Sequence, residues 1–165
     1  MRRLCQVRRI AGAVLWAALA LGAADPPEQP IPFSHNVHVG TVKLQCKMCH
    51  PNPDPGEAMT IAPAATCMQC HSSIRKDSPA IRKLAEYVAS GKEIPWVRVY
   101  QVPPFVYFNH RSHVNANAPC AQCHANAGGS EAVSKEGNIS MDACMTCHQM
   151  RKVSFGCRFC HDFRQ

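Results

Sequence analysis

The sequence predicts a mainly α-helical chain with much irregular structure, built as a duplicated module with two cysteine motifs per copy and a fifth motif appended. Three observations predict this. Cys-x-x-Cys-His occurs five times, Phe-x-His-x-x-His-Val occurs twice, and turn-rich loops separate the motifs. We expect four segments: a signal peptide over 1–24, a first module over 25–72, a linker with an amphipathic helix over 73–104, and a second module with three motifs over 105–165.

Residues 1–24 have the layout of a cleaved secretory signal. Four arginines lie among the first nine residues, an apolar run covers residues 10–21, and small residues end at Ala24. The apolar run is shorter than the roughly 20 residues that a transmembrane helix needs, so a retained membrane anchor is the alternative. We therefore expect export and a periplasmic location.

The charge balance does not point to nucleic acid. The chain has a formal net charge of +7 from 18 Lys and Arg against 11 Asp and Glu. Removing the four arginines of the predicted leader lowers it to +3, because the leader contains no acidic residue. The basic residues form no clustered stretch, so we expect no nucleic-acid partner.

The cysteine pattern indicates c-type haem. Eleven cysteines in an exported chain would ordinarily suggest disulfides, but ten of them form five Cys-x-x-Cys pairs, each followed at once by His. Structural zinc usually takes two such pairs per ion, which strands one of five, and it gives no reason for the His. A thioredoxin-like site expects a single pair beside a βαβ pattern, which is absent.

In a c-type site the two thiols bind the vinyl groups of the porphyrin and the following His is the proximal iron ligand. We therefore expect five covalently bound haem c groups. The cofactor-binding cysteines and proximal histidines are Cys46, Cys49 and His50; Cys67, Cys70 and His71; Cys120, Cys123 and His124; Cys144, Cys147 and His148; and Cys157, Cys160 and His161.

The four other histidines form two copies of one pattern. His35 and His38 follow Phe33, and His110 and His113 follow Phe108, each time shortly before a haem motif. An isolated His is usually an ordinary surface or core residue, but a repeated pair at this spacing indicates iron ligation. Two histidines three apart on a helical turn point in neighbouring directions, so one pair can serve two adjacent haems.

Between the two copies the sequence predicts a capped helix. Ser78 precedes Pro79, apolar residues recur at helical spacing up to Val88, and Gly91 follows the end. Short extended pieces are expected over 95–108, and turn-rich loops over 51–63 and 125–138. Without the leader, about 141 residues would surround five haems, roughly 28 residues each, so the haems must form the core, and we expect the apoprotein to be largely unfolded.

These motifs resemble class III multihaem cytochromes c, which carry bis-histidine haems. The residues Ile-Pro-Trp-Val-Arg-Val at 94–99, Val-Tyr-Phe-Asn-His at 106–110, and Met141 ahead of Cys144 resemble more specifically the pentahaem c-type subunit of alternative complex III and its relatives. The resemblance covers most of the chain from Phe33 onward. It implies a compact multihaem cytochrome fold and redox protein partners, among them a membrane quinol-oxidising complex.

The resemblance also implies which histidine serves which haem. His35 would cap the haem of Cys46 and Cys49, and His110 that of Cys120 and Cys123. His38 and His113 would serve two of the remaining three haems, and the sequence leaves open which two.

The fifth haem lacks a second histidine in this scheme, because five irons share four remaining histidines. Its sixth position is either filled by Met, which raises the potential relative to a second His, or open. Met141 is the first choice, because the resembling family has Met at that offset, and Met59 is the second.

Two functions follow from these expectations. The first is a non-enzymatic electron carrier between a quinol-linked or other redox donor and a downstream acceptor, with no small-molecule substrate. The second is a reductase of a small oxyanion at a haem with an open sixth position. All nine histidines are assigned to iron, which leaves none for proton delivery and favours the carrier.

Overall fold

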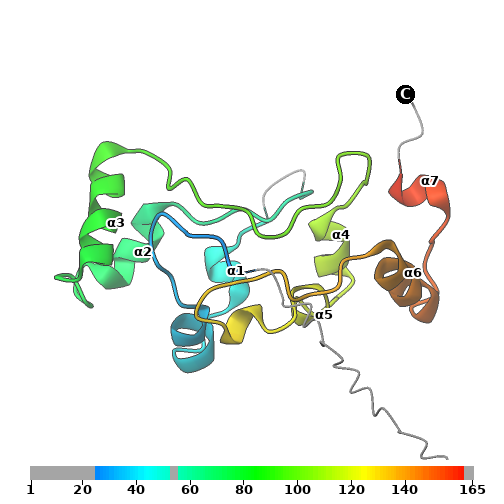
Figure 1. Ribbon diagram of the computed structural model, residues 1–165, viewed down its shortest axis with the longest axis horizontal. Helices are drawn as coiled ribbons and strands as arrows, with labels where there is room; N and C mark the ends of the chain where they lie inside the picture. The colour runs from blue at the N-terminus through cyan, green and yellow to red at the C-terminus, as the bar shows by residue number, and fades with distance from the viewer. Residues whose placement is uncertain (1–24, 53–55, 162–165) are drawn as a thin grey trace, which may run out of the picture.

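The computed structural model describes residues 25–52 and 56–161, and the described chain is a series of short helices joined by irregular segments (Figure 1). The described residues contain no β-strand, only an isolated antiparallel bridge between Val106 and His161. The expected mainly helical chain is confirmed at this level. The helices are η1 (Asn36–Thr41, a π-helix), α1 (Cys46–Cys49), α2 (Ala64–His71), α3 (Pro79–Ser90), α4 (His110–Asn115), α5 (Ala121–His124), η2 (Ala127–Gly129, a 3₁₀-helix), α6 (Met141–Met150) and α7 (Cys157–Cys160).

Each cysteine motif lies largely in a helix. Helices α1, α5 and α7 have four residues each, and helices α2 and α6 begin three residues before the first cysteine of their motifs. In the motifs of α1, α5 and α7 the backbone N–H of the His donates to the carbonyl of the first Cys at 2.9 Å: His50 to Cys46, His124 to Cys120, and His161 to Cys157. This is one closed helical turn, in which residues three apart lie on the same face. The two thiols of a motif therefore project to one side, with the His directly after them.

Helix α3 forms where the sequence predicts it. The Ser78 side chain accepts a hydrogen bond from the Ile81 N–H at 3.2 Å, Pro79 is the first helical residue, and Gly91 ends the helix with a φ of 65°. These are a serine N-cap, a proline in the first turn and a left-handed C-terminal glycine. The prediction of a capped helix is confirmed from its first residue to its last.

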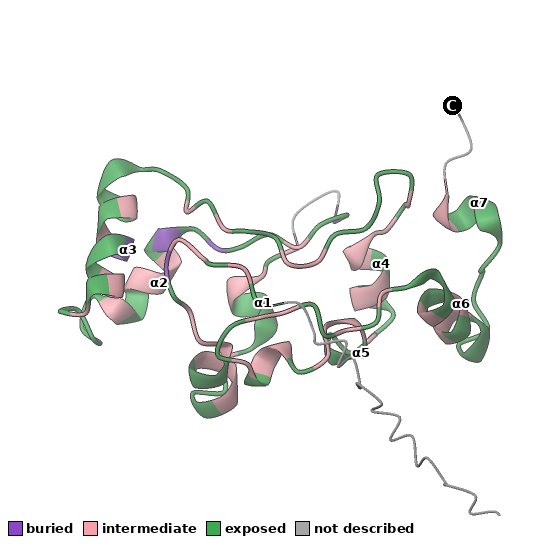
Figure 2. Ribbon diagram, viewed as in Figure 1, coloured by how far each residue is buried: buried purple, intermediate pink, exposed green. Residues whose placement is uncertain are grey.

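Helix α3 packs on α2, and there the molecule has its small side-chain core. Ile31, Ala64 and Leu84 are buried, with Met68 and Trp96 among the partly buried residues packed against them. Figure 2 shows most of the buried residues at this end of the molecule, whereas Gly56, which is also buried, lies against Arg111. No described residue of 105–161 is buried. The α3 helix is thus attached to the motif at Cys67 rather than lying apart from it.

The five motif helices lie in a row along the long axis of the molecule. Figure 1 shows α2 beside α3 at one end, then α1, α5 and α6, with α7 at the other end. Along this row the second motif of the chain, in α2, therefore comes before the first motif, in α1. Among the described residues no helix is both long and apolar enough to cross a bilayer. The predicted leader over 1–24 lies outside the described residues.

Candidate haem sites

The two histidine segments, residues 33–39 and 108–114, make the same aromatic contacts. The Phe33 ring meets His35 edge-on at a centroid distance of 4.9 Å and stacks on His38 at 4.3 Å. The Phe108 ring meets His110 edge-on at 4.7 Å and stacks on His113 at 4.6 Å. Each phenyl ring therefore fixes the orientation of both histidines that follow it.

The second histidine of each segment is also held by the backbone four residues earlier. His38 Nδ1 lies 2.8 Å from the Ser34 carbonyl oxygen, and His113 Nδ1 lies 2.9 Å from the Asn109 carbonyl oxygen. A ring whose Nδ1 donates to a carbonyl presents its unprotonated Nε2 outward, which is the form that binds a metal.

Each of these four histidines faces the histidine of one cysteine motif. The ring centroids are 6.3 Å apart for His35 and His50, with the ring planes at 2°, and 6.3 Å apart for His110 and His124, with the planes at 9°. The remaining two pairs have centroids 6.0 Å apart: His38 with His71, and His113 with His148.

These separations fit one metal ion between the two rings of each pair. A metal–imidazole nitrogen bond is about 2 Å long, and the ring centre lies about 1 Å beyond that nitrogen, so two imidazoles on opposite sides of one ion have centres about 6 Å apart. The separations exceed those of rings in direct face-to-face contact. The histidine pairs therefore suit two axial ligands on one haem iron.

We name the five sites by the chain order of their motifs. Site 1 contains His50 with His35, and site 2 contains His71 with His38. Site 3 contains His124 with His110, and site 4 contains His148 with His113. Site 5 contains His161, whose ring centre lies 5.9 Å from that of Phe105.

The motif histidines are oriented by backbone carbonyls as well. The Nδ1 atoms lie 3.2 Å from the Thr60 oxygen for His50, 3.0 Å from the Ile74 oxygen for His71, and 2.6 Å from the Ser154 oxygen for His148. In site 3, the Tyr100 ring meets His124 edge-on at 4.6 Å. These carbonyl partners could not be predicted from the sequence, because any residue type carries a backbone carbonyl.

Burial favours the neutral form of the two central histidines His35 and His124. Burial lowers the pKa of His35, and the nearby His50 and His38 lower it further. Burial likewise lowers the pKa of His124, with additional contributions from His110 and His50. A neutral imidazole is the form that coordinates a metal, so these shifts favour ligation.

The cysteines connect neighbouring sites. Burial raises the pKa of the Cys67 thiol, and the nearby Cys49 raises it further. Sites 2 and 1 are therefore neighbours. Burial also raises the pKa of Cys120, and Cys46 adds to it through charge and a side-chain hydrogen bond, which joins sites 3 and 1. Burial and neighbouring cysteines also raise the pKa of two further thiols. The neighbours of Cys123 are Cys144 and Cys147, and those of Cys144 are Cys160 and Cys147.

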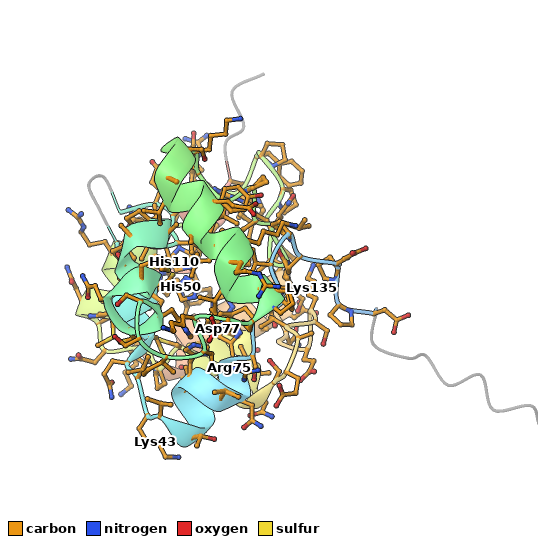
Figure 3. All side chains as sticks on the ribbon, turned by 90° about the vertical axis from the view of Figure 1, so that its left-hand side faces the viewer. Lys43, His50, Arg75, Asp77, His110 and Lys135 are labelled. Atoms are coloured by element: carbon orange, nitrogen blue, oxygen red, sulfur yellow. The ribbon has the colours of Figure 1, made fainter. Side chains whose placement is uncertain are left out.

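The spatial order of the sites is therefore 2, 1, 3, 4, 5. Sites 3 and 4 are also linked by a hydrogen bond from the Gln122 side chain to Cys147 Sγ at 3.3 Å. Figure 3, viewed along the long axis, shows His50 and His110 close together in projection, and both lie near enough to His124 to lower its pKa. The five sites form one continuous series with site 2 and site 5 at its ends.

Site 5 is attached to the segment that leads into the second histidine pair. The Tyr107 N–H donates to the Cys160 carbonyl at 2.8 Å, beside the bridge between Val106 and His161. Met141, the predicted sixth ligand, is the first residue of α6 and is 60% exposed. Met59, the second choice, lies in the loop between the first two motifs. Both assignments stay predictions.

Closed clusters of the zinc type do not form in the described part of the chain. No group of three or more His, Cys, Asp or Glu side chains gathers there in an arrangement that could hold a metal ion. No disulfide joins the ten described cysteines. The histidines instead meet in pairs, as two axial ligands of a haem require.

The chain is similar to a curated multihaem cytochrome. It matches no protein-family profile. It is 33% identical over 147 residues to the multiheme cytochrome c subunit of menaquinone reductase from Nitratidesulfovibrio vulgaris. The match covers 88% of this chain but 57% of that subunit, so the chain spans little more than half the length of its relative. The similarity supports a multihaem cytochrome c with covalently bound haem and a role in electron transfer.

Proposed function

We propose that this chain is a periplasmic cytochrome with five haem c groups that relays electrons between a quinol-linked or other redox donor and a downstream acceptor. The observation that carries the proposal is the set of four histidine pairs with centroid separations of 6.0 to 6.3 Å. Each pair joins a motif histidine to a histidine of the Phe-x-His-x-x-His segments. Iron ligation by these pairs would explain why all eight residues are histidine.

The chain supplies the attachment points, the ligands and the surroundings of the cofactors. The ten motif cysteines would hold the porphyrins covalently, and the four histidine pairs would bind the irons of sites 1 to 4. The haem groups, when bound, supply the redox-active irons. Carbonyl groups fix the rings of His38, His50, His71, His113 and His148, so that the ligands need little rearrangement when the iron changes oxidation state.

A relay also needs its sites close together, and the cysteine contacts support this. Cys67 lies near Cys49, the Cys46 and Cys120 thiols lie within hydrogen-bonding reach of each other, and Cys144 lies near both Cys123 and Cys160. The series of sites has two separate ends, one beside α3 and one at α7 (Figure 1). Such an arrangement suits transfer from a donor at one end to an acceptor at the other.

A quinone-linked partner is supported by the relative, which is named as a subunit of menaquinone reductase, an activity in which the quinone accepts electrons. We propose that this chain likewise works beside redox proteins of a membrane quinone-linked complex. We also propose that residues 25–72 and 105–165 are duplicated modules, because segments 33–39 and 108–114 make matching ring contacts and matching Nδ1 hydrogen bonds.

The direct test is the haem content of the exported protein. Pyridine haemochrome analysis and intact mass should give five haems per chain, and the double variant Cys157→Ala, Cys160→Ala should give four. A wild-type value below five would contradict the proposal.

A second measurement separates the relay from the oxyanion reductase. Ferric relay protein should show no high-spin absorption and should bind neither cyanide nor nitrite. Binding of one equivalent of either ligand per chain, with turnover of the oxyanion, would favour the reductase instead.

A further inference from the structure

The loop that follows the first motif of each module contacts the histidine segment of the other module. The Arg111 N–H, next to His110, donates to the Gly56 carbonyl at 3.0 Å. The Asn36 N–H, next to His35, donates to the Ser130 carbonyl at 2.9 Å. Arg111 and Asn36 occupy the same position of the repeated pattern, so the two modules exchange equivalent backbone contacts.

One of these exchanges reaches the histidine ring itself. The Glu57 carbonyl oxygen lies 2.9 Å from His110 Nδ1 and accepts a second hydrogen bond from the His110 backbone N–H at 3.3 Å. The equivalent atom of the first module, His35 Nδ1, is buried and has no hydrogen-bond partner in the described part of the chain. Two histidines with the same local contacts therefore differ in this one bond.

Gly56 is what allows the loop to come so close. Its φ is +85°, in the region that favours glycine, and a Cβ at this position would lie 2.6 Å from both Cβ and Nε of Arg111. The Arg111 guanidinium reaches back to the Asn52 carbonyl at 3.5 Å. The Asn52 amide, in its hydrogen-bonding orientation, joins the Gly56 carbonyl at 3.1 Å to the Arg111 N–H at 3.2 Å.

A carbonyl that accepts from the Nδ1–H of an iron-bound histidine fixes the ring and raises its basicity. A more basic axial ligand favours the ferric state, so the reduction potential of that iron falls. The Glu57 carbonyl belongs to the first module, whereas the iron site that it would influence belongs to the second.

We infer that the backbone of Gly56 and Glu57 is a positioning element for His110, so that the first module completes site 3 of the second module and lowers its potential. The inference rests on the proposed function, because it needs a haem between His110 and His124. The inference explains what lowers the reduction potential of site 3. It also explains why the two modules would depend on each other.

The test is a redox titration of the full-length holoprotein with the Gly56→Ala substitution. The added methyl group must push the loop away from Arg111, so the bond from His110 Nδ1 should be lost. We expect one of the five reduction potentials to rise, with the other four and the haem count unchanged. In a His110→Met background the same substitution should produce no further shift, because a thioether has no N–H to donate.

One control variant isolates the loop at Gly56. Gly91→Ala places a side chain at a comparable positive φ of 65°, with no atom within 4 Å. It should change no potential. Potentials in Gly56→Ala equal to wild type, or a shift that persists in the His110→Met background, would overturn the inference.

A milder variant decides the matter where Gly56→Ala does not yield holoprotein. Asn52→Ala removes the amide that joins Gly56 to Arg111 and leaves the glycine backbone intact. We expect a smaller rise of the same potential, and an unchanged potential would overturn the inference. The proposed function itself fails separately, on a wild-type haem count below five.

Discussion

The two histidine segments share their internal contacts but differ in what surrounds them. In residues 33–39 and 108–114 alike, one phenyl ring orients two histidines, and the second histidine bonds to the carbonyl four residues before it. Beside the first segment lies a side-chain core between α2 and α3, whereas no described residue of 105–161 is buried. Ligand geometry is therefore a local property of the repeated pattern, and packing differs between the halves.

The largest expected effect comes from preventing haem attachment altogether. A chain with all ten motif cysteines replaced by Ser should lose most of its far-ultraviolet helical signal, because helices of three to twelve residues are marginal alone and the described part of the second half has no side-chain core. Remaining hydrogen-exchange protection should be confined to α2 and α3. A native-like circular dichroism spectrum would contradict this account of the packing.

The next effect tests the equivalence of the two segments. His38→Ala and His113→Ala should each remove one axial ligand, so that one of five haems becomes high-spin and binds one equivalent of cyanide. Absorption and electron paramagnetic resonance spectra measure both changes. Ser112→Ala, an exposed substitution beside His113, is the control and should leave every haem low-spin. Different outcomes for the two histidines would break the equivalence.

The difference in packing is tested by truncating one side chain at each end. Leu84 is 5% exposed, so Leu84→Ala should lower the free energy of unfolding by about 2 to 4 kcal/mol. Met150, in α6, is 69% exposed, so Met150→Ala should change it by less than about 0.5 kcal/mol. Denaturant unfolding of the holoprotein measures both, and similar losses for the two variants would contradict the comparison.

The smallest expected effect concerns the N-caps of the longest helix in each half. The Ser78 hydroxyl accepts from the Ile81 N–H at 3.2 Å, and the Ser140 hydroxyl accepts from the Ala143 N–H at 3.3 Å. Ser78→Ala and Ser140→Ala should each cost about 1 kcal/mol. Substitution with Thr, which retains the cap oxygen, should restore most of the lost stability in thermal unfolding. A cost at only one site would show that the two caps are not equivalent.

The sequence was most informative where the chemistry depends on residue type and close spacing. The five cysteine motifs and the helix Pro79–Ser90 could be read from local patterns, and the structure confirms that helix. The structure brings His35 beside His50 and His110 beside His124, and the assignment of each pair to one haem stays a prediction. The partners of His38 and His113 could not be read, because they depend on how distant segments fold together.

Other features left no trace in the sequence for a physical reason. The carbonyl oxygens of Thr60, Glu57 and Ser154 orient histidines through backbone atoms that every residue possesses. The spatial order of the sites, with the second motif before the first, follows from the path of the loops rather than from any motif. The role of Gly56 could not be predicted from the sequence either, because it depends on the approach of Arg111 from the other module.

The central claim is that four histidine pairs each hold one iron. Low-temperature electron paramagnetic resonance and near-infrared magnetic circular dichroism of the fully oxidised protein count bis-histidine haems directly, because the axial ligands determine these spectra. The account predicts four bis-histidine haems and one haem of different ligation per chain. Fewer than four bis-histidine haems in a protein that carries its full haem complement would contradict it.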